Sequence, residues 1–125
     1  MTAKPEAAKG AEITVYHNPA CGASRNVLAA IRETGREPKV VEYLKAGWTK
    51  PQLQSLLKAM GKSARDILRV RGTSAEARGL TKTTASDDAI IEAMIAEPIL
   101  VERPIVVTPK GTALCRPAER LQELL

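Results

Sequence analysis

The stretch ITVYHNPACGASRNVLAAI, residues 13–31, predicts a β-strand that leads through a short loop into an α-helix. β-Prone residues fill positions 13–16, and the proline and glycine of residues 17–22 break the strand. Gly35 stands where a helix typically ends. The apolar residues that recur on one face of this helix are Val27, Leu28 and Ile31. Cys21 is therefore expected at the N-terminus of a helix.

The flanking segments extend this unit in a consistent order. A second β-prone run at 39–43 makes residues 12–43 a β-α-β unit, whose strands are parallel. The middle of the chain is helical, with a capping box at 49–52 and a second helix capped by Ser86.

The last third predicts a hairpin and a helix. Residues 105–108 and 112–115 read as paired strands joined by the turn residues 109–111, and Pro117 opens a final helix. The order β-α-β, helical block, β-β-α predicts an α/β fold with one mixed sheet, and the thioredoxin-like fold with a helical insertion has this plan. We expect a single domain over residues 12–125, preceded by a disordered leader at 1–11.

Composition excludes several classes of function. The 125 residues suit one domain. With one His and two Cys, a four-ligand zinc site cannot be built from these residue types, and we expect no metal. One Trp, two Tyr and no Phe, with a dispersed net charge of +5, argue against a nucleic-acid partner. No apolar run reaches a membrane span and no secretory signal is visible, so we expect a cytoplasmic protein.

Cys21 is the first candidate for chemistry. The partial positive charge and free N–H groups of a helix N-terminus favour a thiolate. From an ordinary pKa near 8.5, a shift of about two units would make the thiolate the majority form at pH 7. The alternative is a buried, inert Cys. Because Cys21-Gly-Ala-Ser24 has no second Cys, a dithiol mechanism within this loop is excluded.

Two polar residues flank this Cys. His17 would help to hold a thiolate if protonated, or it would simply bond to nearby backbone as a strand-end residue. Ser24 would donate to the sulfur, cap the helix, or do both, which is the reading we favour.

Three arginines form the candidate anion site. Arg69 follows the short middle helix, Arg103 precedes a proline whose peptide bond can be cis, and Arg116 follows Cys115. Arginine suits multidentate recognition of tetrahedral oxyanions, but no spacing rule shows that these three converge.

Three motifs resemble the glutaredoxin-coupled arsenate reductases. They are residues 13–26, from Ile13 to Asn26; Ile67-Leu68-Arg69; and residues 98–117, from Pro98 to Pro117 without the residue at 110. With similar spacing between them, the resemblance covers about residues 12–118. It implies a thioredoxin-like fold with a helical insertion and a cis Pro104.

The resemblance also implies roles for the candidate residues. Cys21 matches the nucleophile, and His17 and Ser24 match residues that assist and contact it. Arg69, Arg103 and Arg116 match the arginines that hold the oxyanion, while the Cys matched by Cys115 is not essential. The partners implied are arsenate, glutathione as co-substrate and glutaredoxin, with no tightly bound cofactor.

Related proteins supply the alternatives. An Spx-like regulator that binds RNA polymerase shares this fold, but Ser24 stands where such regulators often carry the second Cys of a redox switch. A glutathione-dependent thiol reductase of the same superfamily is a second alternative, against which the three matched arginines count. Two departures from the family are a short C-terminal tail and the extra charge of Arg71.

Overall fold

The computed structural model describes residues 13–116 and 118–125, and the chain forms two compact units. One unit joins the chain up to Glu42 with the segment from Arg103 onward, and the other runs from Tyr43 to Glu102. The leader predicted at 1–11 and the helix start predicted at Pro117 lie outside the described residues. The single domain expected over 12–125 stays a prediction.

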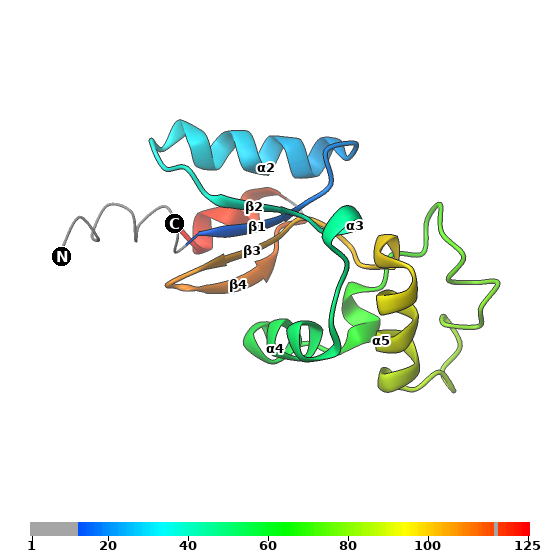
Figure 1. The fold of residues 1–125 in the computed structure, drawn as a ribbon. Coiled ribbons are helices and arrows are strands. Elements are labelled where there is room, and N and C mark those ends of the chain that lie inside the picture. The colour runs from blue at the N-terminus through cyan, green and yellow to red at the C-terminus, as the bar shows by residue number, and fades with distance from the viewer. Residues whose placement is uncertain (1–12, 117) are drawn as a thin grey trace. The chain divides into compact units, whose positions relative to one another are not determined.

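The first unit is built on a four-stranded mixed sheet in the order β2-β1-β3-β4 (Figure 1). Strand β1 (Thr14–His17) pairs in parallel with β2 (Lys39–Glu42) and antiparallel with β3 (Ile105–Thr108). β3 pairs antiparallel with β4 (Gly111–Leu114). The predicted parallel β-α-β unit and the later hairpin are both confirmed.

Helix α2 (Gly22–Glu33) and the 3₁₀ helix η3 (Ala118–Glu123) share the core of this unit. Val15, Val106 and Ala113, which are in register on β1, β3 and β4, contribute the sheet side of that core. The final helix is thus a 3₁₀ helix. Leu121 lies within this helix and Leu124 directly follows it, three positions further along the chain, and both side chains are buried.

The second unit holds the helical insertion. It contains α3 (Tyr43–Ala46), α4 (Lys50–Met60), η1 (Ala64–Ile67), α5 (Asp87–Ala96) and η2 (Pro98–Leu100). The predicted capping box is present, since the Gln52 backbone N–H donates to Thr49 Oγ1 and the Thr49 N–H donates to Gln52 Oε1, both at 3.2 Å. Ser86 caps α5 by accepting from the Ala89 N–H at 3.1 Å.

Tyr43 departs from its predicted place at the end of a strand. β2 stops at Glu42, and Tyr43 begins α3 instead. Its ring is fully buried beside Trp48, with centroids 5.1 Å apart, and its hydroxyl donates to the Val101 carbonyl at 3.2 Å. Burial of the ring and the bond to Val101, 58 positions away, outweigh the β propensity of tyrosine. Among the described residues, no helix is long and apolar enough to cross a membrane.

Candidate active site

Cys21 is the N-cap residue of α2, with extended backbone angles of φ −96° and ψ 122°. The loop before it is held by two bonds to Asn18: the Cys21 N–H donates to the Asn18 carbonyl at 3.0 Å, and the Ala20 N–H donates to its Oδ1 at 2.9 Å. Asn18 is itself buried. The loop therefore fixes the half-exposed sulfur at the positive end of the helix.

The surroundings of this sulfur favour the thiolate. Burial raises the pKa of the Cys21 thiol, but hydrogen bonds from the Ser24 backbone N–H, Arg103 and Arg116, with the charge of Arg103, outweigh it and bring the pKa to about 7. Arg116 Nη1 lies 3.7 Å from Sγ. A pKa of about 7 corresponds to a substantial thiolate fraction at neutral pH, which favours a reactive Cys21 over the alternative of an inert one.

Arg103 is the buried cation of the site. The residue is 7% exposed, and its peptide bond to Pro104 is cis. Arg116 Nη1 donates to the Arg103 carbonyl at 3.1 Å, which ties the two arginines together. Nε and Nη1 of Arg103 are buried and find no hydrogen-bond partner among the described residues. Because buried charged donors are costly when unpaired, these N–H groups suit an anion beside the sulfur.

His17 and Ser24 form a buried pair beneath the loop. His17 Nδ1 and Ser24 Oγ are 2.7 Å apart, and the Asn18 N–H donates to the same hydroxyl at 3.1 Å. Burial lowers the pKa of His17 against the opposing charge of Glu42, which favours the neutral form of the ring. The ring has the Ser24 hydroxyl as its partner, in place of the nearby backbone that the second reading of His17 expected.

The interpretation of Ser24 as a helix cap is wrong. Cys21 occupies the N-cap position, and the Ser24 hydroxyl is turned to His17 and Asn18. Ser24 reaches the sulfur through its backbone N–H, a group that any residue at this position would carry. The bonds to His17 and to the Asn18 N–H are the ones that need the hydroxyl, and sequence alone did not indicate either of them.

Arg69 belongs to the second unit, and its surroundings are described within that unit. It lies directly after Leu68, which bridges Val101, and its backbone N–H donates to the Leu100 carbonyl at 2.8 Å. Its Nη1 donates to Glu102 Oε1 at 3.0 Å in a partly buried ion pair. Sequence reasoning missed Glu102, because the two residues are 33 positions apart and only the bridge brings them together.

Cys115, the other thiol, has a different environment. It is fully buried, and burial raises its pKa to about 11. It is therefore a protonated, enclosed side chain at neutral pH, unlike Cys21.

A model of the ArsC family matches residues 16–124. The chain belongs to the ArsC family. It is 50% identical over 113 residues to the arsenate reductase ArsI2 of Synechocystis sp., covering 90% of this chain and 81% of that one. It is 49% identical to the arsenate reductase of Escherichia coli K12, over 90% of this chain and 80% of the relative.

Solved structures agree with this assignment to the ArsC family. The arsenate reductase of Vibrio cholerae superposes with a TM-score of 0.85 at 34% identity, covering 90% of this chain and 97% of that one. The thioredoxin-like fold with a helical insertion is thereby confirmed.

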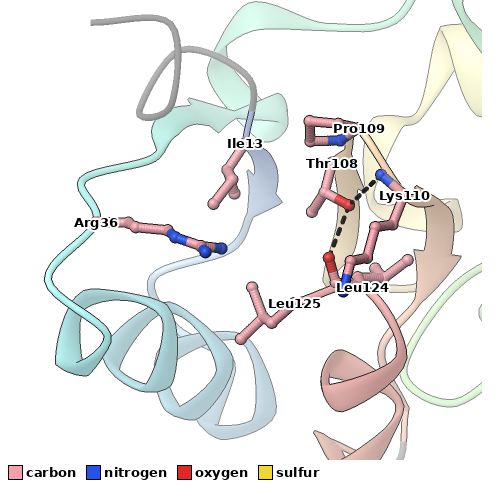
Figure 2. Close-up of a pocket in the computed structure, with 7 residues that line it drawn as sticks. All are labelled: Ile13, Arg36, Thr108, Pro109, Lys110, Leu124 and Leu125. Carbon is pink, nitrogen blue, oxygen red and sulfur yellow. Dashed lines mark hydrogen bonds between the residues drawn. The ribbon is translucent and has the colours of Figure 1, made fainter. Parts of the chain in front are cut away.

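A cavity of about 210 Å³ lies at the other end of the sheet from Cys21 (Figure 2). Ile13, just before β1, and Thr108, the last residue of β3, line it, whereas Cys21 follows the opposite end of β1. The Thr108 hydroxyl inside it is already bonded to the Leu124 carbonyl and the Lys110 N–H. This cavity is separate from the candidate site.

Proposed function

We propose that this ArsC-family chain reduces arsenate to arsenite, with Cys21 as the nucleophile and with glutathione and glutaredoxin as the reductants. The observation that carries the proposal is the buried Arg103 guanidinium beside a thiol with a pKa of about 7, since Nε and Nη1 of this arginine find no hydrogen-bond partner among the described residues. The relatives named as arsenate reductases, about half identical over most of the chain, support it.

The arginines bind arsenate in this proposal. At neutral pH arsenate is largely a dianion, and Arg103 and Arg116 both carry charge to within hydrogen-bond reach of the Cys21 sulfur. Charge-assisted bonds from guanidinium groups fit a tetrahedral oxyanion well. We assign Arg69 as the third arginine. Glu102 binds it through Nη1 alone, so other N–H groups of Arg69 are left for an oxyanion oxygen.

The first chemical step joins sulfur to arsenic. The Cys21 thiolate attacks As(V), one arsenate oxygen leaves as water after taking up two protons, and an S–As bond forms. Arsenic stays at oxidation state five in this adduct. The arginines offset its charge throughout the step.

Reduction follows with an external thiol. The glutathione thiol gives its proton to an arsenic-bound oxygen, and the resulting thiolate attacks the Cys21 sulfur and forms an S–S bond. The electron pair of the S–As bond leaves with arsenic, which becomes As(III) and departs as arsenite. Glutaredoxin then takes the glutathione from the mixed disulfide and regenerates the Cys21 thiol.

His17 and Ser24 position the nucleophile in this scheme. A neutral His17 adds no positive charge, so it acts by holding the Ser24 side chain. The same residue supplies the backbone N–H that bonds the sulfur. The chemistry uses side chains and external thiols, so the proposal includes no tightly bound cofactor, and the reduced thiols that it needs suit a cytoplasmic setting.

A coupled assay tests the proposal. Arsenate, glutathione and glutaredoxin are supplied, and NADPH consumption by glutathione reductase is followed. Arsenate-dependent turnover that stops when either thiol partner is omitted, and that Cys21→Ser abolishes, is the expected result. No turnover by folded protein with a reactive Cys21 would contradict it, and capture of RNA polymerase would then favour the Spx-like alternative.

A further inference from the structure

A groove runs along helix α2 from the loop that carries Cys21. Its volume is about 580 Å³, within the range of small-molecule sites. All of its lining belongs to the first unit. The lining residues are His17, Pro19, Arg25, Leu28, Ala29, Arg32 and Glu33.

We propose that this groove binds glutathione, so that the thiol and the oxyanion are held by different arginines. The inference rests on the proposed function, in which an external thiol must come to the Cys21 sulfur. The residues that follow argue for glutathione in particular, because their charges match the charges at its two ends.

Arg25 marks the end of the groove beside the nucleophile. Its Nη1 donates to the Pro19 carbonyl at 2.8 Å, and its Nη2 lies 3.8 Å from where a Cβ on Gly22 would be. The guanidinium is therefore held against the loop on both sides of Cys21 in sequence. Its remaining N–H groups have no partner within the described part of the chain, and they suit a carboxylate.

Arg32 and Glu33 provide a cation and an anion at the other end. Arg32 uses Nε and Nη2 to bind Glu37, at 2.9–3.2 Å, and its Nη1 has no hydrogen-bond partner within the described residues. Glutathione carries one carboxylate at its glycine end, and both a carboxylate and an ammonium group at its γ-glutamyl end. This pattern complements Arg25 at one end and Arg32 with Glu33 at the other.

The length of the ligand fits the same two ends. Arg25 and Arg32 are seven residues apart, which is about 10.5 Å along an α-helix. An extended tripeptide spans about 10 Å. Leu28 and Ala29 lie between the two arginines and offer an apolar floor to the methylene groups of the ligand.

Direct binding is the first test, with S-methylglutathione as an unreactive probe. Titration into the ¹⁵N-labelled protein is expected to shift the amide signals of residues 28–33 and 25, and Arg25→Ala is expected to weaken binding about fivefold. Arg36→Ala, which removes an exposed arginine that lines the other cavity, is the matched control and should leave the affinity unchanged. Shifts confined to other elements, or none at saturating probe, would overturn the proposal.

Kinetics provide the second test and separate the two proposals. Arg25→Ala should raise the KM for glutathione about fivefold and leave the KM for arsenate within twofold. The glycine ethyl ester of glutathione should show the same defect with the wild-type protein, and Arg25→Ala should add nothing to it. An equal effect of Arg25→Ala on the KM for glutathione and on the KM for arsenate would overturn the proposal that the groove binds glutathione. Absent turnover, with probe binding intact, would count against the proposed function alone.

Discussion

At the scale of single residues, Cys21 and Cys115 show how surroundings set the reactivity of one functional group. Cys21 is half-exposed with donors around its sulfur, and Cys115 is enclosed by apolar side chains. The pKa falls to about 7 in the first case and rises to about 11 in the second. Only the thiolate is a good nucleophile, so the two thiols differ by orders of magnitude in expected reactivity.

Alkylation by iodoacetamide measures this difference. In the native protein we expect modification of Cys21 with a pH midpoint near 7, because the reactive form is the thiolate present above its pKa. Arg103→Ala should move the midpoint upward towards about 8.5, since a donor and a positive charge are lost. Mass mapping identifies the modified residue. Rapid native labelling of Cys115, or an unchanged midpoint in the variant, would contradict this account.

Cys115→Ala tests whether the second thiol takes part in turnover. We expect most of the arsenate-dependent activity to remain, because a buried thiol with a pKa near 11 is almost wholly protonated at neutral pH. The coupled assay and a thermal melt of the same sample are the measurements. A folded variant without activity would show that an internal thiol relay operates.

The two arginines beside the sulfur are expected to act on substrate. Arg103→Ala and Arg116→Ala should each lower kcat/KM for arsenate tenfold or more, given about 1.5–3 kcal/mol for a hydrogen bond to a charged group. Arg36→Ala, an exposed arginine away from the sulfur, is the control. Wild-type kinetics in both site variants would show that Arg103 and Arg116 do not bind the arsenate oxyanion.

Residue types could place Cys21 at a helix start, whereas the choice of Arg69, Arg103 and Arg116 rested on the resemblance to a known family, and neither indicated the partners of these side chains. Cys21 was predictable because a strand, a loop and a helix start are all local patterns. The Ser24 hydroxyl on His17 and the Glu102 carboxylate on Arg69 were not, since they depend on loop geometry and on a bridge between distant segments.

At the scale of elements, local signals defined the helices and strands well where capping chemistry was strong. The start of α4 was predictable from Thr49 and Gln52, whose reciprocal bonds satisfy two free N–H groups. The start of α3 was not, because Tyr43 is placed by burial and by a carbonyl 58 residues away. The sequence also did not predict that the last helix is a 3₁₀ helix, since its few apolar residues suit an α-helix and a 3₁₀ helix alike.

The capping box of α4 should be measurable in stability. Thr49→Ala removes the side-chain acceptor of the Gln52 N–H, and we expect a loss of about 1 kcal/mol in the free energy of unfolding. Thr83→Ala, at an exposed position in a turn, is the matched control and should have little effect. Urea unfolding followed by circular dichroism gives both values. Equal stability of the two variants would show that the cap contributes nothing.

At the scale of the whole molecule, charge is the property that acts beyond any single contact. The chain carries 19 basic and 14 acidic residues, for a net charge of +5 at pH 7. Such a field draws anions towards the protein and fades with ionic strength, because the Debye length shrinks from about 30 Å at 0.01 M to about 8 Å at 0.15 M. Arsenate and glutathione, the substrates of the proposed function, are both anionic at neutral pH, so this field should attract both.

We therefore expect kcat/KM for arsenate to fall as salt is raised over this range, while kcat changes little. Long-range attraction helps the encounter of free enzyme and substrate, whereas kcat reports on the complex already formed. Two salts with different anions should give the same curve at equal ionic strength, because screening does not depend on the identity of the ion. A curve that follows the anion instead would mean that the salt competes directly for Arg103 and Arg116, and the steering argument would then fail.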